Sequence, residues 1–353
     1  YQITYQKLLM IKVKILNPTR DRNEPTFRPF YFFKDKLREY SVDITESDDY
    51  DFLFIGMSDF WDMSLSLKDS IDWGLENIKK HTDNGEYFLF DGFDSTSMLG
   101  SYEVFEQSDA TYLFKHQLLK NREDYNNVYA YGKWWFGTGS GLDVSYDISE
   151  EMWSKIKLSG FNLGLQLPDY HNHFEISNNK IHDVCAIYQG VHEPVPFNQV
   201  TAPGIQYTEH RTSAWNILKE HGSKYDVLVD KLPKQEYLSK LWQSKLAISP
   251  FGQGEVCYRD FELMQFGTLM IKPDMSNVKT FPNPYISGDT YIPVKHDWSD
   301  LMETIETILD NYNEYSDISE NFRREFKKIY VADNVCLHWY DVFKSLNNIK
   351  GVI

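Results

Sequence analysis

The chain lacks the features that mark a disulfide scaffold or a membrane protein. Only three of its 353 residues are cysteines, Cys185, Cys257 and Cys336. An odd, widely spaced set fits a reducing compartment and argues against a disulfide framework or a metal cluster. No apolar run is close to the length of about 18 residues that a transmembrane helix needs, and the sequence does not open with a signal-peptide pattern. We therefore expect a cytoplasmic protein without a membrane span.

Positive charge is also scarce. The 36 Lys and Arg residues face 52 Asp and Glu residues, so the net charge is −16. This charge argues against a nucleic-acid groove or an anionic membrane surface as a partner. An anionic ligand has to be held by a local basic pocket against the field of the whole molecule.

What the chain does have is enough length and apolar content for two domains, each with its own core. The sequence does not begin with Met, and residues 10–16 resemble a natural start, so we expect the residues before them to be a leader. Aromatic residues are abundant, and we expect most of them to build cores, although such rings also stack on sugars.

In the first half, buried strands alternate with helices. Strands are expected over 11–16, 50–56, 87–90 and 110–115. Helices are expected over 30–40, 69–81 and 147–157, and another is expected to follow Lys115 and to run through Arg122. This alternation predicts a Rossmann-like domain over residues 1–175. The polar stretch near 175 is interpreted as the link to a second domain.

Two aspartates follow the strand at 87–90. Asp91 and Asp94 lie where a strand's carboxyl end opens into a loop, the usual place for chemistry in such a sheet. Either one could act as a general base, and neither spacing nor sequence ranks them. The alternative is local turn formation, because Asp commonly terminates strands. Lys115 is expected near the same edge, in contact with an acceptor.

Two further segments are candidates for binding an acceptor. Arg20 and Arg22 lie in an arginine-rich loop after the first strand, although a solvated loop is the simpler interpretation for either residue. Trp134 and Trp135 lie in a glycine- and aromatic-rich stretch, 131–141, that lacks the context of a phosphate loop. At least one of these two rings is expected to pack in a core.

A metal site is not expected. Asp91 and Asp94 are three residues apart and do not form an Asp-x-Asp pair, and His171 and His173 have no third ligand cluster nearby. With no metal, positive side chains and helix termini have to stabilise any leaving diphosphate.

The second half also alternates strand and helix, which predicts another doubly wound parallel sheet over 176–330. Its first strand, at 184–188, turns into a helix at 207–219. Gly190 and Arg211 lie where this strand turns into the helix, so Arg211 is a candidate for binding phosphate. Two terminal helices follow, around 318–330 and 333–346.

The clearest chemical pattern lies at 246–270. An apolar, strand-like run is followed by a glycine turn. A short helix comes next, with Arg259 and Glu262 three residues apart on one face. Gly267 ends this helix. The turn's N–H groups and the helix dipole favour an anion, Arg259 supplies a fork of donors, and Glu262 can accept from ribose hydroxyls. The plain alternative is an ordinary β–turn–α unit with a surface Arg–Glu pair.

The segment SPFGQGEVCYRDFELMQFGTLMI resembles the donor site of exostosin-like and related GT-B glycosyltransferases. Arg259, Glu262 and Gly267 fall on that motif, whereas Leu269-Met270 replaces the family's usual Pro-Val. The resemblance implies that Arg259 meets the donor diphosphate and Glu262 meets ribose. It also implies a closing helix, at 331–353, that crosses back onto the first domain. The other predicted donor contacts are Pro250, Phe251, Gly252, Gln253, Gly254 and Tyr258.

Together these observations predict two Rossmann-like domains facing each other across a cleft, the GT-B type. The predicted activity is metal-independent transfer of a sugar from a nucleotide-sugar donor to a glycan acceptor, with no cofactor beyond the co-substrate. The likeness favours inversion by an aspartate base, and retention stays open. The alternatives are a nucleotide-sugar epimerase of the same architecture and a non-catalytic glycan-binding protein.

Overall fold

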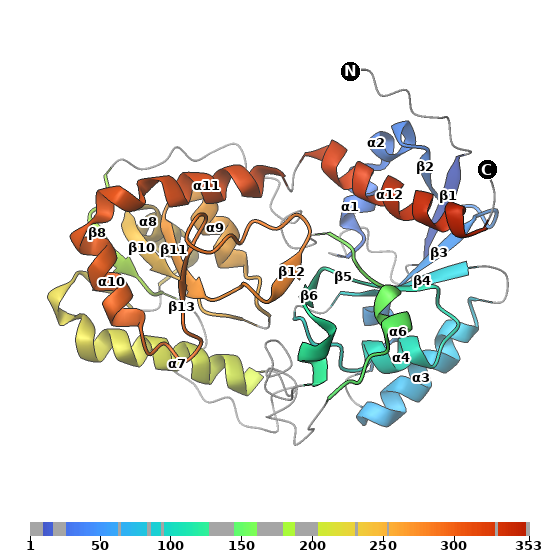
Figure 1. Cartoon of the computed structure of the whole chain (residues 1–353), viewed down its shortest axis with the longest axis horizontal. Coiled ribbons are helices and arrows are strands. Elements are labelled where there is room, and N and C mark those ends of the chain that lie inside the picture. Colours follow the sequence, from blue (N-terminus) through green and yellow to red (C-terminus); the bar gives the residue numbers. More distant parts are fainter. Residues whose placement is uncertain are drawn as a thin grey trace.

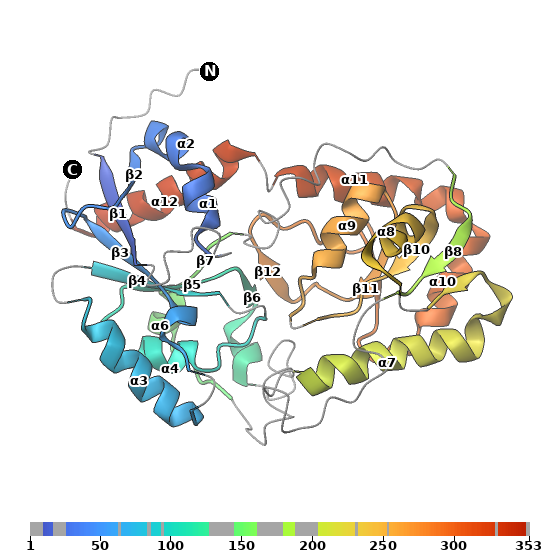
Figure 2. The ribbon, with the colours of Figure 1, turned by 180° about the vertical axis from the view of Figure 1, so that it is seen from behind.

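The computed structural model describes residues 10–16, 26–62, 65–82, 86–92, 95–126, 145–160, 179–187, 204–229, 232–252, 254–328 and 331–350. Within these ranges the chain forms two parallel sheets side by side, linked by a short antiparallel ribbon (Figures 1 and 2).

The first sheet has the strand order β2-β1-β3-β4-β5-β7, and every pairing in it is parallel. Its strands are β1 (Ile11–Leu16), β2 (Val42–Thr45), β3 (Phe52–Gly56), β4 (Glu86–Asp91), β5 (Tyr112–Lys115) and β7 (Ile156–Leu158). Central strand β3 is buried along its whole length because helices cover both faces of the sheet.

Side-chain alternation divides the core of the first domain into two layers. On one face, Phe52 and Phe54 pack with α1 (Arg28–Phe32) and α2 (Lys34–Glu39). On the other face, Leu53 and Ile55 pack with α3 (Leu67–Lys79) and α4 (Ser101–Glu106). The helix expected over 30–40 is therefore two short helices that meet at Phe33.

The second sheet has the order β13-β11-β10-β8-β9 and is also parallel. Its strands are β8 (His182–Cys185), β9 (Val227–Leu228), β10 (Ser244–Ile248), β11 (Leu269–Pro273) and β13 (Ile292–Val294). Helices α8 (Lys234–Trp242), α9 (Tyr258–Phe266) and α11 (Ser316–Lys327) cover one face, and α7 (Gly204–His221) and α10 (Leu301–Asp310) the other. The two parallel sheets confirm the prediction of two Rossmann-like domains.

The last helix, α12 (Ala332–Lys350), lies on the first sheet although it follows the whole second domain in the chain (Figures 1 and 2). The ring of Trp339 is 4.7 Å from that of Phe30 and 4.9 Å from that of Phe114. Phe343 belongs to the same core. The last helix therefore contributes to the core of the first domain.

Two strands join the domains directly. β6 (Gln117–Leu119) pairs antiparallel with β12 (Val278–Thr280), and Lys120 donates its backbone N–H to Asn277 O at 2.8 Å. The prediction of a helix directly after Lys115 is therefore wrong. This segment forms strand β6 because the second domain supplies a strand partner. Residues 156 and 157 likewise form edge strand β7 instead of extending α6 (Glu150–Ser154).

Candidate active site

The predicted donor turn lies at the carboxyl end of β10 and leads into α9. Gly252 donates its N–H to Gly254 O at 3.0 Å, which closes the turn on itself. Helix α9 is then capped at Cys257, which donates its backbone N–H to the carboxylate of Asp260, the third residue of the helix, at 3.1 Å. Gly267 ends the helix with φ +59°. The turn and the helix start therefore form a rigid, amide-rich corner of the kind that favours anions.

Arg211 reaches this turn from α7. Its Nε donates to Phe251 O at 2.9 Å. A Cβ on Gly252 would lie 2.9 Å from Arg211 Nη2, so a side chain at this position would require the guanidinium to shift. The structure thus brings together Arg211, Phe251 and Gly252, which the sequence separated by about 40 residues.

Several positive side chains act on the turn. Burial raises the pKa of the Cys257 thiol, while the charges of Lys272, Arg211 and Arg259 all oppose that rise. The negative charge of Asp260 adds to it. Three cations from different elements therefore act on one residue at the start of α9, in a chain of strongly negative net charge.

Glu262 lies one turn along α9 from Arg259 and is half-buried. Its Oε2 accepts a hydrogen bond from Tyr237 OH at 2.7 Å. Burial raises the pKa of Glu262, and the Tyr237 bond and the charge of Arg259 counteract the rise. Tyr258, at the first position of the helix, is 45% exposed.

A buried network that the sequence did not reveal holds the turn in place. The Asp260 carboxylate accepts from Ser249 Oγ at 2.6 Å and from Tyr285 OH at 2.8 Å, and pairs with Lys272 Nζ at 3.0 Å. The Asp260 and Lys272 side chains have no exposed surface. Their partners are 11 to 25 residues away, so only a Lys inside an otherwise apolar strand hinted at the pair.

Two histidines pack beside the same turn. The His210 ring is 5.7 Å from the Phe251 ring and 4.6 Å from that of His296. Burial lowers the pKa of His210 well below its usual range and lowers that of His296 to about 4. Both imidazoles are therefore neutral near pH 7.

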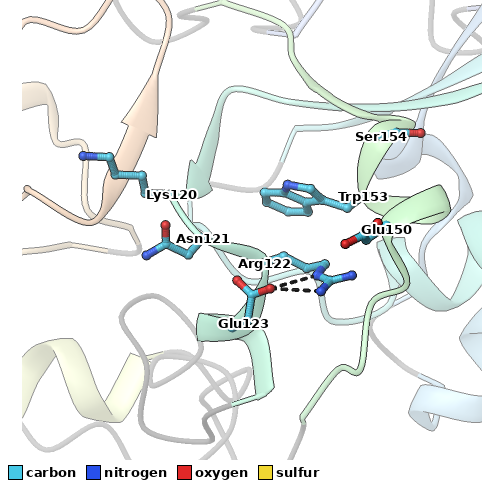
Figure 3. Close-up of a pocket in the computed structure, with 7 residues that line it drawn as sticks. All are labelled: Lys120, Asn121, Arg122, Glu123, Glu150, Trp153 and Ser154. Atoms are coloured by element: carbon cyan, nitrogen blue, oxygen red, sulfur yellow. Dashed lines mark hydrogen bonds and ion pairs between the residues drawn. The ribbon is translucent and has the colours of Figure 1, made fainter.

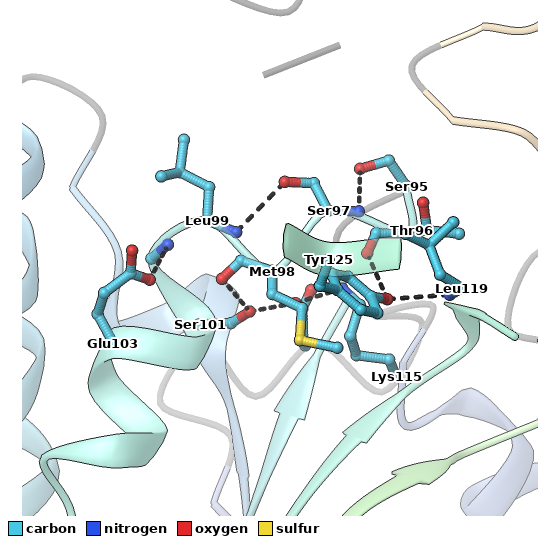
Figure 4. A network of polar contacts seen from close by, with 12 residues as sticks. Ser95, Thr96, Ser97, Met98, Leu99, Ser101, Glu103, Lys115, Leu119 and Tyr125 are labelled. Atoms are coloured by element: carbon cyan, nitrogen blue, oxygen red, sulfur yellow. Dashed lines mark hydrogen bonds and ion pairs between the residues drawn. The ribbon is translucent and has the colours of Figure 1, made fainter. Parts of the chain in front are cut away.

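In the first domain, the carboxyl end of β4 is occupied by a buried ion pair. Asp91 Oδ2 lies 2.5 Å from Lys115 Nζ and accepts from Ser101 Oγ at 2.5 Å, and neither member of the Asp91–Lys115 pair has exposed side-chain surface. This corrects two expectations, because the Asp91 carboxylate is not presented to a substrate and the Lys115 ammonium is not available to an acceptor. Figure 4 shows Lys115 and Ser101 among the polar contacts of this region.

The strand ends of the two domains meet at Glu255, a residue that the sequence did not single out. Its carboxylate accepts from Thr96 N at 3.1 Å and from Thr96 Oγ1 at 2.8 Å. Burial raises the pKa of Glu255, and the hydrogen bonds from Thr96 counteract the rise. Tyr125 OH, in turn, donates to Thr96 O at 3.0 Å (Figure 4). The donor turn is thus bonded to the loop after β4.

Several predicted site residues lie outside the described part of the chain. They are Asp94, Arg20, Arg22, Trp134, Trp135, Gly190 and Gln253.

The described residues contain no cluster of three or more His, Cys, Asp or Glu that could hold a metal ion. One Asp-x-Asp, formed by Asp49 and Asp51, precedes β3. Asp51 accepts the Lys12 N–H at 2.7 Å and Asp49 pairs with the Lys12 ammonium, so both belong to the amino end of the sheet. Nor does any helix in the described ranges have the length and apolarity to cross a membrane.

Comparison with known proteins gives structural likeness only. No protein-family model and no curated protein sequence matches this chain. The structure is similar to that of Anabaena Alr3699/HepE in complex with UDP-glucose, at 11% identity and a TM-score of 0.46, over 95% of this chain and 100% of that one. It is similar to TarM at 9% identity and a TM-score of 0.45, over 90% and 58%.

A third similar structure is an alpha-glucosyltransferase in complex with UDP and a 13-mer DNA, at 11% identity and a TM-score of 0.42, over 95% and 99%. At such low identity and TM-score these likenesses assign no activity to this chain. The exostosin-like membership stays a prediction, and the architecture rests on the chain's own two sheets.

Proposed function

We propose that this protein is a glycosyltransferase that moves a sugar from a nucleotide-sugar donor to a glycan hydroxyl. The observation that carries the proposal is the meeting of Arg211, the glycine turn and the α9 N-terminus at the carboxyl end of β10. Ligands of open α/β sheets bind at such carboxyl ends. A cation bonded to a closed, amide-rich turn is suited to an anion such as a diphosphate.

The donor is held from two sides in this proposal. Arg211 and Arg259 meet the diphosphate, and Glu262 accepts from the ribose hydroxyls. Tyr237, which bonds Glu262 at 2.7 Å, orients this carboxylate for the ribose. The exposed ring of Tyr258 borders the donor at the first turn of α9.

The transfer itself is written as an in-line displacement. The acceptor oxygen forms a bond to the anomeric carbon, the bond from that carbon to the diphosphate breaks, and the nucleoside diphosphate leaves. Arg211, Arg259 and the α9 dipole stabilise the negative charge that develops on the leaving group, so no metal ion is required. The acceptor proton passes to a carboxylate base.

For the base, we favour Asp94 over Asp91. Asp91 is engaged with Lys115 and Ser101, and giving up that pair would leave a buried ammonium without its counter-charge. Asp94 follows three residues later in the sequence. An inverting mechanism with Asp94 as the base is therefore the specific form of the proposal.

A panel of UDP-, GDP- and TDP-sugars tests the donor half of the function. We expect one nucleotide series to bind and to release its diphosphate, with transfer to an added glycan, in the presence of EDTA. Complete inactivation by EDTA that Mn²⁺ or Mg²⁺ reverses would contradict metal independence. Interconversion of the donor sugar without transfer would identify an epimerase, and sugar binding without turnover a glycan-binding protein.

A further inference from the structure

A pocket of about 390 Å³ lies on the first domain, between the 3₁₀ turn Arg122–Asn126 and α6 (Figure 3). This volume is within the range of about 300–1,000 Å³ that is typical of ligand sites. None of its lining residues belongs to the donor turn, to the Asp91 pair or to the predicted acceptor segments. Its main lining residues are Lys120, Asn121, Arg122, Glu123, Glu150 and Trp153.

The indole of Trp153 is the apolar part of this pocket. The ring is half-buried and packs at 5.8 Å and 56° against Tyr125. Tyr125 is itself fully buried, and its OH is fixed by Leu119 N at 2.9 Å and by Thr96 O. The indole therefore rests on a rigid support on one side while it lines the pocket. An indole offers a flat apolar face together with one N–H donor.

Polar groups surround the indole. Arg122 donates to Glu123 Oε1 through Nε at 3.2 Å and through Nη2 at 2.9 Å, so this pair is already formed. Among the described residues, neither Lys120 Nζ nor Trp153 Nε1 has a hydrogen-bond partner, so both can bond to a ligand. Figure 3 shows the indole lying between Lys120 and Asn121 on one side and Glu150 and Ser154 on the other.

The charges of the pocket cancel. Lys120 and Arg122 contribute two positive charges, and Glu123 and Glu150 contribute two negative ones. A site with this balance does not favour an anion, in contrast with the donor turn and its three cations. Its chemistry suits a neutral molecule with many hydroxyls and one apolar face, which is the description of a neutral pyranose.

We propose that the Trp153 pocket binds a neutral pyranose unit of the acceptor glycan, stacked on the indole. Its role as an acceptor site rests on the proposed function. The contacts connect it to the donor turn, since Trp153 packs on Tyr125, Tyr125 bonds Thr96, and Thr96 bonds Glu255. A sugar stacked on the indole is therefore connected, through Tyr125 and Thr96, to Glu255, where the two domains meet.

Saturation-transfer NMR on the full chain tests the pocket with four probes, the methyl glycosides of glucose, galactose, mannose and N-acetylglucosamine. We expect at least one to bind saturably, and Trp153→Ala to weaken that binding about tenfold or more. Trp73→Ala removes another indole, the 37% exposed one on α3, and is the control that keeps binding unchanged. Asn121→Ala, at an exposed residue, provides a second variant should Trp153→Ala lower the thermal midpoint.

Fluorotryptophan labelling identifies the ring, because the resonance that disappears in Trp153→Phe is the one that must shift with sugar. The proposal is overturned if none of the four glycosides shifts it, or if methyl glucuronide or inorganic phosphate shifts it more strongly. These measurements contain no nucleotide, so a failed donor site does not affect them. Saturable binding at Trp153 without any transfer would support the pocket and remove the transferase.

Discussion

Arg259 is the residue on which the donor assignment depends most. If its guanidinium forks onto the diphosphate, Arg259→Ala loses charge-assisted hydrogen bonds that contribute about 1.5–3 kcal/mol each. We expect nucleotide affinity to fall below detection by calorimetry, with the thermal midpoint nearly unchanged. Arg259→Lys restores only part of it, because an ammonium cannot reproduce the bidentate fork.

The matched control is Arg324→Ala, which removes a 59% exposed arginine from α11. Nucleotide affinity in this variant is expected to equal that of the wild type. Unchanged nucleotide binding in Arg259→Ala would remove the donor assignment, and a large fall in its thermal midpoint would indicate that Arg259 is structural.

The Asp91–Lys115 pair separates a structural role from a catalytic one. Removing one partner of a buried pair leaves an uncompensated charge, so we expect Asp91→Asn to lower the free energy of unfolding by about 3–5 kcal/mol. Asp91→Asn combined with Lys115→Met is expected to lose less than the two single changes together. Urea unfolding measures all three variants. An Asp91→Asn variant of wild-type stability that transfers sugar at least about 100-fold more slowly would instead restore Asp91 as the base.

At the residue scale, the sequence predicted those features that depend on residues nearby in the chain. Helical spacing predicted that Arg259 and Glu262 lie on one helix next to a glycine turn, and α9 contains both. Glu255 was missed because its partner, Thr96, is 159 residues away. The sequence correctly placed Asp91 at the carboxyl end of a strand. It did not predict that Asp91 is buried against Lys115 and Ser101, because these partners lie 24 and 10 residues away.

At the scale of elements, Lys180 ties the ends of two helices to the start of β8. Its Nζ donates to Trp242 O at 2.9 Å, to Phe266 O at 3.3 Å and to Thr268 Oγ1 at 3.1 Å. These carbonyls lie at the carboxyl ends of α8 and α9, where cations are favourable. Burial nevertheless lowers the pKa of Lys180 to about 8.

This lowered pKa predicts a pH dependence. Between the folded pKa and the unfolded value of about 10.4 the unfolded chain binds more protons, so the lysine's contribution to stability rises with pH. We expect the stability difference between wild type and Lys180→Met to shift in favour of the wild type between pH about 8 and 10. Urea unfolding of both proteins measures it. Lys328→Met, which replaces an exposed lysine at the C-cap of α11, serves as the control, and a difference that does not change with pH would contradict the prediction.

The ribbon of β6 and β12 predicts how strongly the domains are linked. Lys120 bonds Asn277, so the alternating antiparallel pattern makes Lys279–Leu118 the next bonded pair. Because the Lys279 side chain is exposed, Lys279→Pro acts through the lost N–H, and Lys279→Ala is the matched control. We expect faster hydrogen exchange at Leu118 and Lys120 in the proline variant alone. Equal exchange in both variants would show that the ribbon is not formed in solution.

Elements within one domain were largely predictable, because each strand and helix carries its own periodicity. Strands β6 and β12 were not, since each is three residues long and is stabilised by a partner in the other domain. The helix expected over 30–40 broke at Phe33, where two short helices meet. Short segments follow their tertiary partners more than their propensities.

At the scale of the whole molecule, we expect Glu255 to make the contact between the domains sensitive to pH. Burial raises its pKa, so the folded chain binds more protons than the unfolded chain above pH about 4.3. The stability that Glu255 contributes is present below that pH and is lost as the pH rises through the folded pKa. We expect Glu255→Gln to flatten this slope, because an amide does not titrate and still bonds Thr96.

Thermal unfolding from pH about 4 to 7 compares Glu255→Gln with the wild type. Glu303→Gln, which replaces an exposed carboxylate on α10, is the control that keeps the wild-type slope. Parallel curves for Glu255→Gln and the wild type would show that the buried carboxylate does not titrate in this window.

The position of α12 has a consequence for the order in which the molecule can be built. Trp339 covers the part of the first sheet's face around Phe54 and Phe114 that α1 and α2 leave open, and this part stays uncovered until the entire second domain has left the ribosome. At about 5–20 residues per second, a nascent first domain spends on the order of tens of seconds with that aromatic surface uncovered. Chaperones would meet this protein at the first domain, and a polymerase or ribosome error late in the message would harm the half of the protein made first.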